Sequence, residues 1–196
     1  MIRAQNLTAV GTVDLARLSA AEAVARADHL AHIYGSAQGA AAEPASGWAA
    51  HLVTSVQEYA GATVRVALSG PAVGPPGRAA REIVGFLHGY DLQLQHWWPQ
   101  QVEPALRARG HGFWLEDAFE LVELDVLPQA QGRGIGTALL TAQLAEMHQR
   151  RMLLATDPAG RARVLYRRLG FVDLVPDFVY EGTAYGAALM GWDRHA

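Results

Sequence analysis

The sequence predicts an α/β fold: a mixed, mostly antiparallel sheet of six or seven strands, flanked by about four helices. Apolar residues recur at helical spacing in the first third of the chain. Strand-like apolar runs follow, separated by segments rich in glycine and proline. The last third then reads as strand, helix, strand, helix and strand. This order of elements predicts the mixed sheet.

Two helices are expected first. Ser19 and Glu22 form a capping-box pattern, after which apolar residues continue at helical spacing as far as Gly35. A second helix contains Trp48 and is closed by Gly61. Strands are expected at 63–68, 82–90, 114–127, 152–156, 171–175 and 185–192.

The segments between these strands follow from their glycine and proline content. Segment 69–81 is expected to be a loop, and 91–112 an insertion with a short helix at about 104–109. A helix should follow a glycine-rich turn and run to about residue 151. The last helix should bury Ala162, Leu165 and Leu169 and end at Gly170.

Composition excludes several kinds of chemistry. A chain of 196 residues with 51% apolar and 18% charged residues suits a single domain over 1–196. With no Cys, there is no disulfide, thiolate nucleophile or cysteine-bound zinc. All 16 basic residues are Arg, which excludes a Walker A lysine and a Schiff-base lysine. His88, His96 and His111 lack a metal-ligand spacing, so no metal is expected.

The charge balance and the hydropathy bear on partners and location. The net charge of -3 gives no general attraction to nucleic acid, and most of the six Arg between 150 and 168 are interpreted as parts of solvated helix faces. No secretory signal and no membrane span is recognised. We therefore expect a cytoplasmic protein with neither a nucleic-acid nor a membrane partner.

A glycine-rich turn follows an apolar strand and opens an apolar-faced helix. Glycines let the backbone approach a ligand closely, and the unpaired amides of a first helical turn suit a pyrophosphate such as that of coenzyme A. A tight turn without a ligand is one alternative. A Rossmann turn is a weaker one, because Thr137 stands where a third glycine is needed. The turn consists of Gln131, Gly132, Arg133, Gly134, Ile135, Gly136 and Thr137.

Two blocks of sequence resemble the GNAT superfamily of acyl-CoA-dependent N-acetyltransferases. Leu-Asp-Val-Leu-Pro at 124–128 and the turn at 131–136 resemble the family's strand and its [Q/R]-x-x-G-x-[G/A] motif. Ala-Arg-Val-Leu-Tyr-Arg-Arg-Leu-Gly-Phe at 162–171 is similar to its A-x-x-L-Y-x-x-x-G-F block. The resemblance covers about 116–192 and implies direct transfer of an acetyl or similar acyl group from acetyl-CoA to a small-molecule or peptide amine.

The resemblance also assigns roles to residues. Strands beside the turn should splay, so that backbone groups of Leu124 and Val126 meet the pantetheine arm and the Val126 amide polarises the thioester carbonyl. Residues 131–137 should hold the pyrophosphate, with Arg133 nearby. Tyr166 corresponds to the general acid, and Glu120 to an acidic base found in several members.

Each catalytic candidate has a simpler alternative. An amine with a pKa near 10 needs a proton acceptor, for which Glu120, Glu123 and Asp125 are candidates. All three carboxylates could instead be solvated ones at a strand edge. Tyr166 could merely pack against the core. Four aromatic or imidazole side chains of the insertion could line the acceptor pocket or only pack onto the sheet: His96, Trp97, Trp98 and His111.

Two other functions remain open. One is a non-catalytic module with the same fold that binds coenzyme A or another protein. The other is a nucleic-acid-binding domain that uses the Arg cluster between 150 and 168. The sequence identifies neither the acceptor amine nor the acyl chain, and a homodimer is left open.

Overall fold

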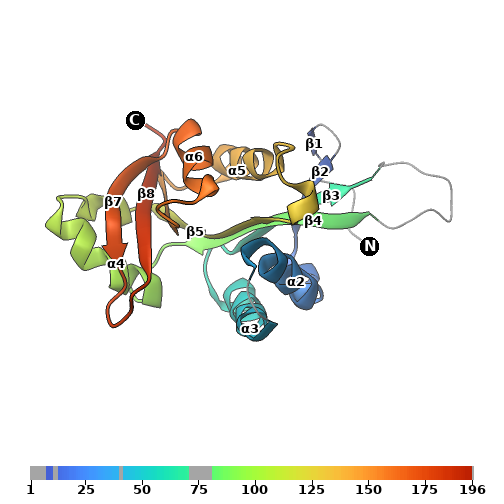
Figure 1. Cartoon of the computed structure of the whole chain (residues 1–196), viewed down its shortest axis with the longest axis horizontal. Helices are drawn as coiled ribbons and strands as arrows, with labels where there is room; N and C mark the ends of the chain where they lie inside the picture. The colour runs from blue at the N-terminus through green and yellow to red at the C-terminus, as the bar shows by residue number, and fades with distance from the viewer. Residues whose placement is uncertain (1–7, 11–12, 40–41, 71–80, 196) are drawn as a thin grey trace. The chain divides into compact units, whose positions relative to one another are not determined.

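The computed structural model describes residues 8–10, 13–39, 42–70 and 81–195 (Figure 1). The chain divides into two compact units. The first comprises Met1–Gly89 and Glu123–Glu146, and the second comprises Tyr90–Val122 and Met147–Ala196. Two strands, β4 (Glu82–Asp91) and β5 (Ala118–Val126), contribute residues to both units.

The first unit contains an antiparallel run of strands in the order β1-β2-β3-β4. The strands before β4 are β1 (Thr8–Val10), β2 (Val13–Leu18) and β3 (Thr63–Ser69). The first two were not expected from the sequence. In β2 the alternation of Val13, Asp14 and Leu15 is short, and its partner strand lies about 50 residues further along the chain. The loop expected at 69–81 lies mostly outside the described residues.

The capping box at Ser19 is confirmed, but the single helix expected there is two helices. The Ser19 hydroxyl accepts from the Glu22 amide at 3.3 Å, and a Glu22 carboxylate oxygen accepts from the Ser19 amide at 3.0 Å. Helix α1 (Ala20–Val24) ends early, and α2 (Ala27–Gln38) follows. Gly35 lies inside α2, and it is Gly39, in the left-handed conformation at φ 67°, that ends the helix.

Two further helices cover opposite faces of β4 (Figure 1). Helix α3 (Ala42–Glu58) lies with α2 on one face, where Ser55 hydrogen-bonds His88 of β4 at 2.8 Å. Helix α5 (Ile135–Glu146) lies on the other face, where Arg65 of β3 donates to Gln143 at 2.8 Å. Helix α5 ends at Glu146 and not near residue 151 as expected, and Arg151 already belongs to the next strand.

The second unit joins the first half of β5 to three strands in the order β5-β6-β8-β7. The β5–β6 pair is parallel, and the other two pairs are antiparallel. The elements of this unit are α4 (Trp97–Ala108), the 3₁₀ turn η2 (Gly112–Leu115), β6 (Arg151–Thr156), α6 (Arg161–Arg168), β7 (Val172–Val179) and β8 (Gly186–Asp193). Both units together give the mixed, mostly antiparallel arrangement that the sequence predicts.

The segment 91–112 is more regular than expected. Its helix starts at Trp97, so Pro104 lies inside the helix and not at its start. The amphipathic spacing of Val102 and Leu106, both fully buried, explains the longer helix. The strand expected from residue 114 begins only at Ala118, because η2 precedes it.

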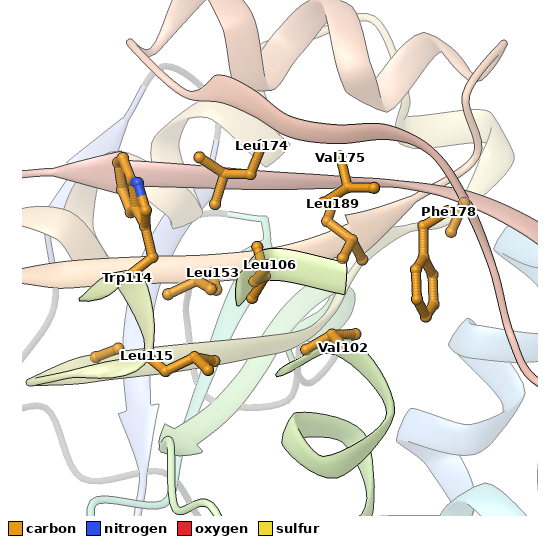
Figure 2. Close-up of a cluster of buried hydrophobic side chains, with 11 residues drawn as sticks. Val102, Leu106, Trp114, Leu115, Leu153, Leu174, Val175, Phe178 and Leu189 are labelled. Atoms are coloured by element: carbon orange, nitrogen blue, oxygen red, sulfur yellow. The ribbon is translucent and has the colours of Figure 1, made fainter. Parts of the chain in front are cut away.

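Helix α4 packs against the core of the second unit (Figure 2). Val102 and Leu106 contact a cluster contributed by η2, β6, β7 and β8. Gly191 of β8 is required there, since a Cβ atom would lie 2.7 Å from the Trp114 ring. On α6, in contrast to the expectation, Ala162 is exposed and Tyr166 is the buried residue. Among the described residues, no helix has the length and apolar character needed to cross a membrane.

Candidate active site

The glycine-rich turn is open to an approaching ligand. Gly132 and Gly134 adopt the left-handed conformation, with φ of 74° and 79°, and a Cβ atom on either would meet nothing within 4 Å. The side chain of Ile135 is buried and anchors the start of α5, while residues 131–134 are exposed. Helical hydrogen bonding begins when the Ala138 amide donates to the Gly134 carbonyl at 2.9 Å. The amides just before Ala138 therefore have no partner within the helix.

Two hydrogen bonds hold the end of β5 in the first unit, one to β4 and one to the side chain of Gln131. The Leu127 amide donates to the Val84 carbonyl of β4 at 2.9 Å. Because successive residues of a strand direct their backbone groups to alternate edges, the amide and carbonyl of Val126 point away from β4. The side-chain amide of Gln131 donates to that Val126 carbonyl at 3.0 Å. Gln131 thus connects the turn to the strand, and the Val126 amide faces the same edge.

Glu123, which is partly buried, and Asp125, which is buried, form an acidic pair on the α2 side of β5. Their spacing of two residues places them on one face, and Gln38 of α2 donates to Asp125 at 3.2 Å. Burial raises the pKa of Asp125 to about 7, although hydrogen bonds from Glu123 and Gln38 oppose the shift. Burial, and then the charge of Asp125, raise the pKa of Glu123 well above its ordinary value. The pair therefore retains a proton near neutral pH.

Glu120 lies in the second unit and is not a solvated carboxylate. Its side chain is 4% exposed. The Tyr90 hydroxyl donates to one carboxylate oxygen at 3.4 Å, and the other oxygen has no partner in the part of the chain that the structure describes. Burial raises the pKa of Glu120 to about 8, and the Tyr90 hydrogen bond only partly offsets this. Such a carboxyl is suited to accepting and releasing a proton near neutral pH.

Tyr166 also lies in the second unit, on α6. It is 6% exposed, and its ring packs on Phe171 with centroids 5.5 Å apart. Its backbone carbonyl accepts from the Phe171 amide at 3.1 Å, which ties the end of α6 to the residue before β7. The packing that the sequence offered as the alternative is present, and the role of the hydroxyl stays a prediction.

The candidates thus fall into two groups. Leu124, Val126 and the pair formed by Glu123 and Asp125 belong to the first unit with the turn, and the hydrogen bond from Gln131 to Val126 joins the turn to the strand. Glu120 and Tyr166 belong to the second unit. Sequence reasoning missed the partners of the carboxylates, Gln38 and Tyr90, because each lies far from its carboxylate in the sequence.

The described histidines do not gather with other possible metal ligands. Among the described residues, no three His, Asp or Glu side chains gather in a way that could hold a metal ion. His88 is fully buried between Ser55 and the Thr63 carbonyl, at 2.8 and 3.0 Å. Burial lowers its pKa to about 4, so it is neutral in the fold. Because Ser55 is fully buried too, the pair is structural rather than nucleophilic.

The arginine cluster is largely paired with carboxylates. Asp173 binds Arg163 and Arg167, and Asp193 binds Arg150 and Arg151. Four of the six arginines between 150 and 168 are therefore neutralised within the fold. This pairing weighs against the nucleic-acid reading, which needs free cations facing a phosphate backbone.

Comparison with known proteins identifies the class. Residues 78–173 match the family model for the acetyltransferase (GNAT) domain. The chain belongs to the GNAT acetyltransferase superfamily. It is 36% identical over 118 residues to a GCN5-like protein acetyltransferase of Mycobacterium tuberculosis. That alignment covers 56% of this chain and 57% of the relative, so the chain spans little more than half of the relative's length.

Solved structures share the fold at low sequence identity. A putative GNAT acetyltransferase from Desulfovibrio desulfuricans has a TM-score of 0.61 and 15% identity, over 92% of this chain and 98% of that one. A putative acetyltransferase from Salmonella typhimurium, solved with acetyl-CoA, scores 0.56 at 14% identity, with 93% and 94% covered. The PaiA N-acetyltransferase of Thermoplasma acidophilum, solved with coenzyme A, scores 0.56 at 14% identity, with 93% and 99% covered.

Proposed function

We propose that this protein transfers an acetyl group from acetyl-CoA to an amine, directly and within a ternary complex. The observation that carries the proposal is the exposed turn 131–134 at the start of α5, with two glycines in the left-handed conformation. The structures from Salmonella typhimurium and Thermoplasma acidophilum, which share the fold, contain acetyl-CoA and coenzyme A. Since β4 and β5 run through both units, we propose one acyltransferase domain over 1–196.

The turn has the properties that a pyrophosphate requires. The amides of Gly132 to Thr137 lie at the positive end of the α5 dipole, and the absence of side chains on two residues allows close approach. The exposed guanidinium of Arg133 adds a positive charge beside them. The backbone of Leu124 and Val126 would then receive the pantetheine arm, which pairs with a strand edge through amide groups of its own.

The Val126 amide is proposed to stabilise the charge that develops on the thioester oxygen. A fixed backbone donor costs no reorganisation when the charge appears, and such donors are often the largest catalytic contribution. The Gln131 side-chain amide donates a hydrogen bond to the Val126 carbonyl, and this bond holds this part of the backbone in place. The amide therefore is pre-oriented before the substrate arrives.

Glu120 is proposed as the group that removes the proton from the acceptor ammonium. Its raised pKa brings it closer to that of an amine than an ordinary carboxylate, and one of its oxygens lacks a partner among the described residues. Glu123, which shares a proton with Asp125, is the second candidate for this role. Tyr166 is proposed to donate a proton to the departing thiolate. Because the chain has no Cys, an acyl-cysteine step is excluded.

Release of free coenzyme A in the presence of a panel of amines tests the proposal. The expected result is acceptor-dependent thiol release, with acetyl-CoA binding detected separately by calorimetry. A protein that binds acetyl-CoA but releases no thiol with any amine would be a non-catalytic module. One that fails to bind acetyl-CoA would contradict the cofactor assignment itself.

A further inference from the structure

Three neighbouring aromatic side chains of the second unit, two of them largely exposed, form a surface here named the aromatic shelf: Trp97, Tyr180 and Tyr185. Trp97 and Tyr180 stack with centroids 5.9 Å apart and planes inclined by 10°. The ring centroids of Tyr180 and Tyr185 lie 5.8 Å apart. Trp97 is 66% exposed and Tyr185 is 64% exposed. Large aromatic side chains are mostly buried, so exposure of two neighbours requires an explanation.

The shelf is held in place from beneath. The Trp98 indole N–H donates to the Tyr180 hydroxyl at 3.0 Å, and the Tyr180 ring packs edge-on against Phe178 at 4.8 Å. Phe178 belongs to the core of the second unit (Figure 2). Tyr180 therefore contacts Trp98 and the core residue Phe178, and its ring also stacks with Trp97. A rigid aromatic surface loses little conformational entropy when a flat ligand stacks on it.

A chain of contacts leads from the shelf to Glu120. His96, the residue before Trp97, packs edge-on against the Tyr90 ring at 5.6 Å. The Tyr90 hydroxyl in turn donates to Glu120. Independently, the pKa of Tyr180 is raised by its burial and, to a smaller extent, by the charges of Tyr185 and Glu120. The shelf and the buried carboxyl thus belong to one region of the second unit.

These features define a ligand with two parts. Flat π-systems stack favourably on exposed aromatic rings. A buried carboxylate oxygen that lacks a partner among the described residues calls for an N–H donor. We infer that the acetyl acceptor is a primary amine whose carbon skeleton carries a flat aromatic ring, with the ring on the aromatic shelf and the amine at Glu120. This inference rests on the proposed function and adds the substrate class to it.

Two amines of equal charge test the inference. The 2-phenylethylamine ring is flat, whereas 2-cyclohexylethylamine has a ring of the same connectivity that is not. Binding of each is measured by calorimetry with coenzyme A present, and turnover is measured separately with acetyl-CoA. The wild type should bind phenylethylamine more tightly, and Trp97→Ala should reduce that preference by about tenfold or less, the range expected for an aromatic pair. Trp97→Phe, which retains a ring, should keep most of it.

Val179→Ala provides the matched control. Val179 is 55% exposed and is the last residue of β7, directly before Tyr180, and alternation directs its side chain to the opposite face. This variant should retain the full preference. Equal affinity of the wild type for both amines, or an equal loss in Trp97→Ala and Val179→Ala, would overturn the inference. Because binding is measured without turnover, a protein that discriminates the rings yet releases no thiol would support the shelf and contradict the proposed function.

Discussion

The side-chain amide of Gln131 donates a 3.0 Å hydrogen bond to the backbone carbonyl of Val126. The two residues lie at opposite ends of the short 3₁₀ turn η3 (Pro128–Ala130), so this bond closes the loop between β5 and α5. It couples the proposed pyrophosphate site to the proposed oxyanion donor. A ligand that meets both groups therefore finds them already held at a fixed separation.

Gln131→Ala should weaken acetyl-CoA binding by roughly 2- to 12-fold, the equivalent of one hydrogen bond of about 0.5–1.5 kcal/mol. The bond is exposed, so the melting temperature should change little. Calorimetric titration of acetyl-CoA measures the effect. Gln129→Ala is the control, because Gln129 is an exposed residue of the same turn. Equal losses in both variants would show that the Gln131 bond has no special part in binding.

Gly134→Val should abolish coenzyme A binding, since a branched side chain would occupy the path of the pyrophosphate. Valine at φ 79° is also strained, at a cost of about 1–3 kcal/mol, so some loss of stability is expected. Gly110→Val carries the same strain at φ 75°, and a Cβ atom there likewise meets nothing within 4 Å. Binding is measured by calorimetry and stability by thermal melting. Wild-type affinity for coenzyme A in a folded Gly134→Val protein would contradict the cofactor assignment.

Glu120→Gln should lower turnover by roughly 10²- to 10⁴-fold, the usual contribution of general base catalysis. In the wild type, kcat/KM should rise with pH up to a pKa of about 8, where the carboxyl loses its proton. This rise of kcat/KM with pH should disappear in the Glu120→Gln variant. Steady-state rates between pH 6 and pH 9 provide the measurement. A variant that keeps both the wild-type turnover and this pH dependence would show that Glu120 is not the general base, which would then be Glu123 or water.

Most elements of the fold could be predicted from patterns among neighbouring residues in the sequence. The capping box at Ser19, the strand at β3 and the turn before α5 each depend on neighbouring residues, and all three appear as expected. The short strand β2 did not follow from pattern, because its pairing with β3 joins segments about 50 residues apart. Proline favours the first turn of a helix, so Pro104 predicts a helix start, whereas α4 begins at Trp97 and its buried residues, Val102 and Leu106, lie on both sides of the proline.

The candidate site divides in the same way. The turn could be recognised from its glycines together with its position between an apolar strand and an apolar-faced helix. The burial of Glu120 could not, because it depends on Tyr90, on a different strand, and on apolar residues around both. The aromatic shelf likewise joins Trp97 to Tyr180, 83 positions apart, which no periodicity in the sequence reveals.

Asp125→Asn should stabilise the protein at alkaline pH. The raised pKa of Asp125, about 7, means that the folded state holds a proton after the unfolded state has released it. The stabilisation that this protonation contributes is therefore fully present below the ordinary pKa of 3.8. It is lost as the pH rises through about 7. Asparagine keeps the acceptor for Gln38 and removes the buried charge beside Glu123.

Thermal melting at intervals from pH 5 to pH 9 tests this effect. The fall in melting temperature toward pH 9 should be smaller in Asp125→Asn than in the wild type. Asp28→Asn, at an exposed position in the first turn of α2, should melt like the wild type throughout. Parallel pH curves for all three proteins would show that the pair is not protonated in the fold.

Tyr166→Phe should reduce turnover by about 10²-fold, toward the lower end of the range for general acid catalysis. The coenzyme A thiol resembles free Cys, with a pKa of about 8.5, so the thiolate can leave without full protonation, and a phenol is helpful but dispensable. Phenylalanine keeps the ring against Phe171, 5.5 Å away, so acetyl-CoA affinity and melting temperature should stay near wild type. The alkaline limb of the pH–rate profile should change, because the proposed proton donor is gone. Wild-type turnover in the folded variant would leave Tyr166 as a packing residue and assign the proton to water or another group.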